Sequence, residues 1–206
     1  MTMPFLTDDD RHRIAVAIAE AERRTSGELV AVVAQSASDY RRVPLLWPAL
    51  AALLLPAALL TVQPGMSAWT LYLIQAAAFL VLALLAQLPV SVALVPDWIK
   101  RRRASRVARE QFFERGLHLT RARTGVLIFV SVAEHYVEII ADEGIDALVS
   151  PGTWDKAVAD FVERVRAGRV AEGFLAAIEV VGTRLAEHFP RAPDDPDELL
   201  NHLIEI

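Results

Sequence analysis

The chain has 206 residues, of which 54% are hydrophobic and 23% are charged, and its formal net charge is −5. It contains no cysteine, which excludes disulfides, a thiolate nucleophile and a cysteine-ligated metal site.

The N-terminal residues predict a helix followed by a buried strand. Thr7 is a suitable N-cap for a helix over residues 8–24, whose first turn is acidic and whose core-facing positions recur at helical spacing. Those positions are Ile14, Ala17, Ile18 and Ala21. The β-branched run that starts at Glu28 then predicts a first strand with no helical periodicity.

A long uncharged stretch follows. No Asp, Glu, Lys or Arg occurs between Arg42 and Asp97, and Gln63-Pro64-Gly65 divides the stretch into apolar segments at 43–62 and 66–90. Crossing a bilayer takes about 20 helical residues, so each segment is long enough. We predict a transmembrane helical hairpin over residues 43–96. The alternative, a hairpin buried in a soluble core, requires more surrounding chain than the sequence has.

Charges beside the hairpin predict its orientation. Two spans return the chain to its starting side, and both flanks are basic while the connecting loop is uncharged. The positive-inside rule therefore predicts a two-pass protein of the cell (inner) membrane with both termini in the cytoplasm. We expect the bilayer as a partner, and we expect anionic lipid headgroups rather than nucleic acid to contact the basic run. That run is Lys100, Arg101, Arg102 and Arg103.

The chain after the hairpin predicts further helices and strands. A basic helix runs from Asp97 to near Gly116, with Phe112, Phe113 and Leu117 expected to point inward. The continuous apolar run within 124–131 predicts a second strand over these residues, covered on both faces, and the short turn before Tyr136 predicts an antiparallel hairpin with a third strand. Further expected elements are the strand 136–142, helices over 153–167 and 170–188, and a short amphipathic helical tail over 196–204.

These elements predict an α/β fold. The first two strands are joined through a helix and should therefore be parallel. We expect a small sandwich, with a short mixed sheet flanked by helices, interrupted by the transmembrane hairpin. The α/β domain would consist of residues 1–42 and 97–206, and the hairpin of residues 43–96 with spans at about 43–62 and 66–90.

Three motifs resemble the TPM domain family. They are Thr25-Ser26-Gly27-Glu28, Thr124-Gly125-Val126-Leu127-Ile128 and Ala141-Asp142-Glu143-Gly144-Ile145, in that order along the chain. The resemblance covers nearly all of the chain outside the hairpin. Similar proteins include photosystem repair factors and an accessory protein of acetylcholine receptors, and some members are described as acid phosphatases or calcium binders. The resemblance implies an α/β fold and leaves the activity open.

The expected topology gathers carboxylates at one end of the sheet. Glu28, Asp142 and Glu143 lie where the parallel strands begin and the third strand ends, so they are candidate ligands for Ca²⁺ or Mg²⁺, with the Thr25 and Thr124 hydroxyls nearby. The alternative is structural.

In the structural alternative, Glu28 pairs with Arg24 or Arg123, and Asp142 and Glu143 cap a short helix near Gly144. The opposite end of the sheet, with Asp39, Ser131, Glu134 and His135, should face the bilayer.

Three functions are compatible with this sequence. The first is a membrane-anchored interaction module that assists assembly or quality control of another membrane protein. The second is a metal-assisted phosphatase centred on the three carboxylates. The third is a lipid-facing structural protein that acts through the basic run from Lys100 to Arg109.

Overall fold

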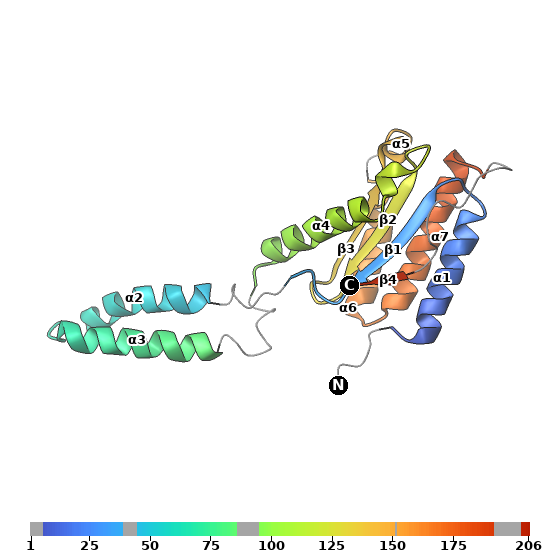
Figure 1. The fold of residues 1–206 in the computed structure, drawn as a ribbon. Helices are drawn as coiled ribbons and strands as arrows, with labels where there is room; N and C mark the ends of the chain where they lie inside the picture. The colour runs from blue at the N-terminus through green and yellow to red at the C-terminus, as the bar shows by residue number, and fades with distance from the viewer. Residues whose placement is uncertain (1–5, 39–44, 86–94, 151, 192–202) are drawn as a thin grey trace. The chain divides into compact units, whose positions relative to one another are not determined.

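The computed structural model describes residues 6–38, 45–85, 95–150, 152–191 and 203–206 (Figure 1). The chain divides into two compact units, one of residues 1–37 with 101–206 and one of residues 38–100. The expected boundaries near residues 42 and 97 stay predictions, because 39–44 and 86–94 lie outside the described residues.

A four-stranded sheet is the centre of the first unit. Its strands are β1 (Glu28–Ala34), β2 (Gly125–Ser131), β3 (Tyr136–Ala141) and β4 (Leu203–Glu205), in the order β3-β2-β1-β4. β1 runs parallel to β2 and β4, and β3 is antiparallel to β2. The mixed α/β sheet, the parallel pair and the antiparallel hairpin are therefore confirmed.

The C-terminal residues differ from the prediction. The helical spacing of Leu199, Leu200, Leu203 and Ile204 predicted a helix, but Leu203–Glu205 pair with β1 as a strand. The rest of the expected tail, 196–202, lies outside the described residues. β1 is buried along its whole length, so backbone groups at its free edge need hydrogen-bond partners. This long-range pairing overrides the local pattern.

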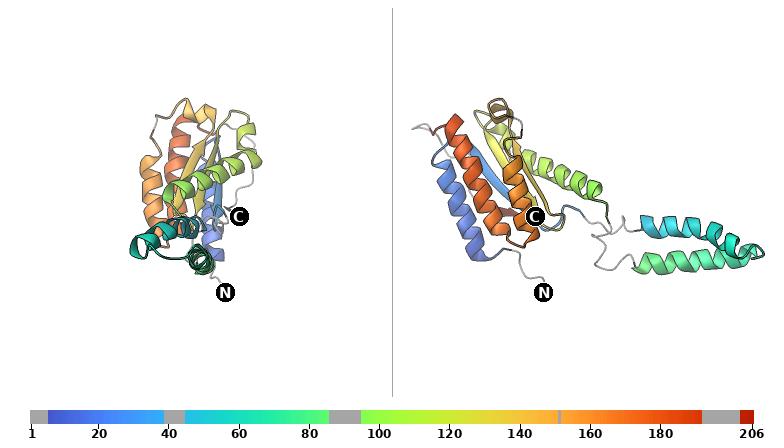
Figure 2. Two further views of the ribbon diagram at one scale, coloured as in Figure 1. Left: turned by 90° about the vertical axis from the view of Figure 1, so that its left-hand side faces the viewer. Right: turned by 180° about the vertical axis from the view of Figure 1, so that it is seen from behind.

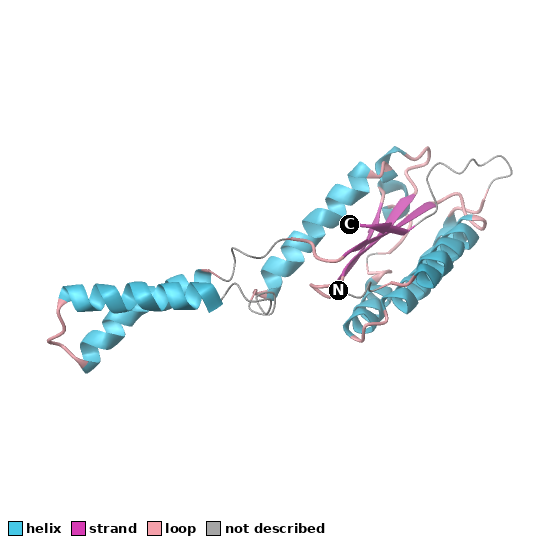
Figure 3. Ribbon diagram, turned by 60° about the horizontal axis from the view of Figure 1, so that its bottom comes forward, coloured by secondary structure: helices cyan, strands magenta, loops and turns pink. Residues whose placement is uncertain are grey.

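Helices cover both faces of the sheet. α1 (Asp8–Glu22), α6 (Asp155–Arg166) and α7 (Val170–His188) lie on one face, as Figure 2 shows from behind. α4 (Asp97–Glu114) and the 3₁₀ turn η2 (Leu117–Leu119) lie on the other face, and Figure 3 shows the sheet between the two layers. Along β1, Leu29, Ala31 and Val33 face the three-helix layer, while Val30, Val32 and Ala34 face α4.

Most expected helices of this unit form where the sequence places them. Thr7 caps α1, with reciprocal hydrogen bonds between Thr7 and Asp10. The expectation for the end of α4 was wrong at one residue. Phe112 and Leu117 are buried, but Phe113 is 59% exposed. At 100° per residue, Phe113 falls on the far side of the helix from the sheet-facing Ala104, Ala108 and Phe112.

The second unit is a helical hairpin. α2 (Leu46–Val62) and α3 (Ala68–Leu85) lie side by side and are joined by the turn at residues 63–67 (Figure 1). α3 is long and apolar enough to cross a membrane, whereas α2, with 17 residues, is shorter. Large apolar side chains of both helices are exposed, among them Leu53, Leu54, Leu80 and Leu84. One helix of this kind is weak support for membrane association, and the structure does not show two passes.

Candidate functional site

Glu28 and Asp142 lie at the expected end of the sheet. Glu28 pairs in register with Gly125, whose carbonyl oxygen accepts a hydrogen bond from the Asp142 backbone N–H at 2.9 Å. Both carboxylate side chains are buried. Because strands are about 4.8 Å apart, the Cα atoms of Glu28 and Asp142 are separated by about 10 Å, the width of two strand spacings.

Leu117 occupies the space over Gly125, between those two positions. A Cβ atom added to Gly125 would overlap the Leu117 carbonyl oxygen, so only glycine fits beneath η2. Leu117 is fully buried. The backbone of η2 therefore lies over the middle strand and separates Glu28 from Asp142.

The guanidinium group of Arg123 neutralises the carboxylates of Asp142 and Glu143. The Arg123 side chain lies 3.2 Å from Asp142 Oδ2 and 3.2 Å from Glu143 Oε2. Its backbone has a φ of 57°, and its Nη1 donates to the His118 carbonyl oxygen. The loop before β2 is thus turned so that Arg123 bridges the two carboxylates.

The structure agrees with much of the structural alternative. Asp142 caps α5 (Glu143–Asp146), because its Oδ1 accepts from the Glu143 N–H at 2.9 Å. Arg24 pairs with Glu179 rather than with Glu28. Arg123, which the sequence offered only as a partner of Glu28, is the main organiser of this edge.

Arg123 occupies the place that a divalent cation would take beside Asp142 and Glu143. Among the described residues, no three His, Asp or Glu side chains are grouped as metal ligands. A cation at Asp142 and Glu143 would have to displace Arg123. The metal role of Glu28, Asp142 and Glu143 stays a prediction.

The two threonines join loops. Thr25 Oγ1 donates to the Phe189 carbonyl oxygen at 2.7 Å and accepts from the Gly27 N–H. Thr124 Oγ1 donates to the Ser26 carbonyl oxygen at 3.3 Å. Both are almost completely buried, so these contacts are structural, and the ligand-binding role of Thr25 and Thr124 stays a prediction.

Glu134 organises the opposite end of the sheet. Its Oε1 accepts from Ser36 Oγ at 3.0 Å and from the Ala37 N–H at 3.1 Å, and its Oε2 accepts from the buried Ser131 hydroxyl. The carboxylate therefore joins the end of β1 to the β2–β3 turn. His135 is exposed beside it, and Asp39 lies outside the described residues.

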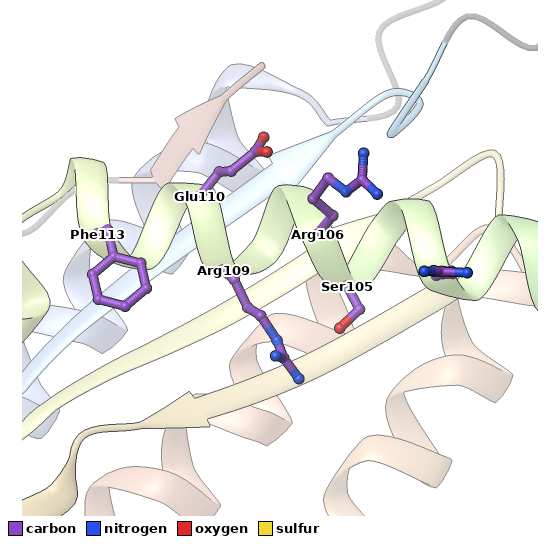
Figure 4. A pocket seen from close by; sticks show the side chains of 6 residues that line it. Ser105, Arg106, Arg109, Glu110 and Phe113 are labelled. Atoms are coloured by element: carbon purple, nitrogen blue, oxygen red, sulfur yellow. The ribbon is translucent and has the colours of Figure 1, made fainter.

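The four predicted lipid-contacting residues have different surroundings on the basic helix α4. Lys100 pairs with Asp97 at 3.3 Å, and Arg103 is half-buried. Arg101 and Arg102 are exposed. An open hollow of about 510 Å³ lies along the helix (Figure 4). It is lined by Arg102, Ser105, Arg106, Arg109, Glu110 and Phe113.

A hydrogen-bonded cluster beside this hollow was not expected from the sequence. Glu138 on β3 accepts from Ser105 Oγ at 3.3 Å and from the Tyr136 hydroxyl at 3.0 Å. Burial raises the pKa of Tyr136 to about 12, and the charge of Glu138 adds to the rise. The alternation of Tyr136 and Glu138 on one face of a strand was the available signal.

Comparisons with known proteins agree with this fold. The model of the TPM domain family matches residues 86–184. No curated protein matches the chain. The NMR structure of the BA42 protein from the psychrophilic bacterium Bizionia argentinensis is similar in fold, with 22% identity and a TM-score of 0.63, over 100% of this chain and 99% of that chain. The resemblance to the TPM domain family is confirmed, and the matched residues 86–184 contain the second and third of the three motifs.

Proposed function

We propose that this protein is a membrane-anchored TPM domain protein that binds another membrane protein and assists its assembly or quality control. In this proposal α2 and α3 cross the membrane as a hairpin and both termini lie in the cytoplasm.

The exposed surface of the hairpin supports the membrane part of the proposal. In water, a hairpin with this much apolar surface would expose a patch well beyond the few hundred Å² usual on monomers. Lipid satisfies these side chains, and the helical backbone satisfies its own polar groups. The basic residues on both sides of the hairpin support the orientation.

One polar side chain within α3 supports a protein partner. A groove of about 360 Å³ on the hairpin is lined by Ala49, Ala52, Leu53, Tyr72, Gln75, Ala76 and Phe79. Within the described part of the chain, the Gln75 amide makes no side-chain hydrogen bond, although it lies in the middle of α3. Small residues let helices approach closely in a bilayer, and a cross-helix hydrogen bond contributes about 0.6–2 kcal/mol. This groove is the observation that best supports a partner helix.

Site-specific crosslinking tests the proposal. A photoreactive amino acid in place of Ala76, inside the groove, should crosslink in native membranes to a discrete polypeptide. The same group in place of Leu84, which is 59% exposed and outside the groove, should crosslink mainly to lipid. Changing Gln75→Leu should weaken the Ala76 crosslink, because it removes the amide without removing volume.

Equal crosslinking at both positions, or a crosslink that Gln75→Leu leaves unchanged, would contradict a specific partner in this groove. Two differently tagged copies of the chain separate the remaining outcomes. A product that contains both tags would identify the partner as a second copy, which contradicts the assembly role.

A further inference from the structure

The surface of α4 is more basic than the rest of the molecule. The helix contains six basic and three acidic residues, whereas the whole chain has a net charge of −5. Ala104, Ala108 and Phe112 fix one side of the helix against the sheet. The arginines on the other sides are therefore held on a rigid element.

The exposed arginines of α4 have no ion pairs with any residue that the structure describes. Within the described residues, no carboxylate lies within 4.0 Å of Arg101, Arg102, Arg106 or Arg109. Most arginines elsewhere in the same unit have ion pairs. Those with ion pairs are Arg11, Arg13, Arg24, Arg123, Arg164, Arg166, Arg169 and Arg184. Within the described residues, four arginines without an ion pair thus lie together on α4, whereas Arg23, Arg115 and Lys156 lack one at separate positions.

Three of these arginines and an exposed aromatic ring share one surface. Arg102, Arg106, Arg109 and Phe113 follow each other at intervals of three or four residues, so they lie along one face of the helix. All four line the hollow, and Figure 4 shows Arg106 and Arg109 projecting to different sides of the helix. We call these four residues the arginine face.

We propose that the arginine face of α4 binds the anionic surface of the lipid bilayer. Guanidinium groups match phosphate oxygens in geometry and charge, and an exposed Phe among them is typical of a helix at a membrane interface. Within the basic run from Lys100 to Arg109, this proposal places the contact on the arginine face, since Lys100 already pairs with Asp97. The three-helix layer would then face away from the lipid.

Chain connectivity selects lipid over other anions. Residues 86–96 separate the apolar helix α3 from α4, and such a segment spans at most about 40 Å when fully extended. The inference therefore rests on the proposed membrane hairpin, which would hold α4 within reach of the headgroups. Lipid attraction of about 1 kcal/mol per arginine means that loss of three arginines should reduce contact by about a hundredfold.

Fluorescence quenching with the full chain tests the proposal. The chain has no cysteine, so a single Glu110→Cys can be labelled inside the hollow, and Glu163→Cys on α6 serves as the control position. Labelled protein is reconstituted into nanodiscs of phosphatidylcholine alone or with phosphatidylglycerol. Lipids with a spin-labelled headgroup are the quencher.

We expect the label at residue 110 to be quenched in anionic discs and much less in neutral discs, with no such difference at residue 163. The triple variant R102Q/R106Q/R109Q should show no quenching. Salt at about 0.5 M should abolish the quenching of the original protein, because it screens exposed charges. The matched triple variant R164Q/R166Q/R169Q removes the same charge from the other layer and should retain it. R102K/R106K/R109K keeps the charge and should also retain it.

Equal quenching in both lipids, or quenching that survives R102Q/R106Q/R109Q, would overturn the proposal. An oligonucleotide or polyglutamate that binds this face while the label stays unquenched would also overturn it and point to another polyanion. Failure of the hairpin proposal looks different. In that case the protein would not enter neutral discs at all, and salt would release it from anionic ones.

Discussion

Removing the Glu134 carboxylate should loosen the end of the sheet from which the chain leaves for the hairpin. In Glu134→Ala, Ser36 Oγ and the Ala37 N–H lose their acceptor, and the fully buried Ser131 hydroxyl loses its partner. A buried polar group without its partner costs about 1–3 kcal/mol, and the two half-exposed bonds add less. We expect a total loss of about 2–3 kcal/mol.

Amide hydrogen exchange on the full chain in detergent measures this effect locally. The reporters are the N–H groups of Val132 and Ala133, which donate to Ala34 and Gln35 at 3.0 and 3.1 Å. Their protection should fall about thirtyfold or more, since 1.4 kcal/mol corresponds to a factor of ten.

Glu134→Gln should have a smaller effect, because its amide retains one acceptor oxygen. Glu187→Ala removes only an exposed ion pair with Arg184 and is the control. If Glu134→Ala lowers the protection of Val132 and Ala133 no more than Glu187→Ala does, Glu134 does not hold the end of β1 to the β2–β3 turn.

The remaining predictions concern the rest of the domain. A double-mutant cycle of Asp142→Asn and Arg123→Gln, measured by urea unfolding, should give a coupling energy of about 1 kcal/mol, because Asp142 is buried but Arg123 is partly exposed. A coupling energy of zero would show that Arg123 does not organise this edge of the sheet. Gly173→Ala should destabilise α7 by about 1–3 kcal/mol, since its Cβ would overlap the Phe161 ring, whereas Gly65→Ala has open space; equal effects would contradict this packing. Tyr136 should titrate near pH 12 by ultraviolet absorbance, and its pKa should fall in Glu138→Gln. Because folding raises this pKa from 10.0, its contribution to stability is complete below pH 10 and is lost as pH rises towards 12; a stability curve without that decline would contradict the buried phenol. Phosphate-ester hydrolysis with Ca²⁺ or Mg²⁺ should be equal and negligible in the wild type and in Asp142→Asn, and metal-dependent turnover lost in the variant would restore the carboxylate site.

The sequence was sufficient for elements whose signals are local. The cap at Thr7, the buried runs of β1 and β2 and the β2–β3 hairpin depend on residues close together in the chain, and all formed as predicted. β4 was missed because its pairing partner lies about 170 residues away and its local pattern suits a helix.

The candidate site depended on information the sequence does not display. Topology correctly placed Glu28 and Asp142 at one end of the sheet, but the carbonyl of Leu117 over Gly125 and the bridging guanidinium of Arg123 follow from tertiary packing. Likewise, charge alone marked the basic run from Lys100 to Arg109, whereas the structure shows that Lys100 pairs with Asp97 and that, among the described residues, Arg102, Arg106 and Arg109 have no ion pair.

Cysteine labelling in this cysteine-free chain tests the membrane hairpin most directly. Pro64→Cys lies in the turn between α2 and α3, and Glu187→Cys lies at the exposed end of α7. With a membrane-impermeant maleimide on intact bacterial cells whose outer membrane is permeable to the reagent, we expect residue 64 to be labelled and residue 187 to be protected until the cells are lysed. Labelling of both positions, or protection of residue 64 with labelling of residue 187, would contradict a two-pass hairpin with cytoplasmic termini.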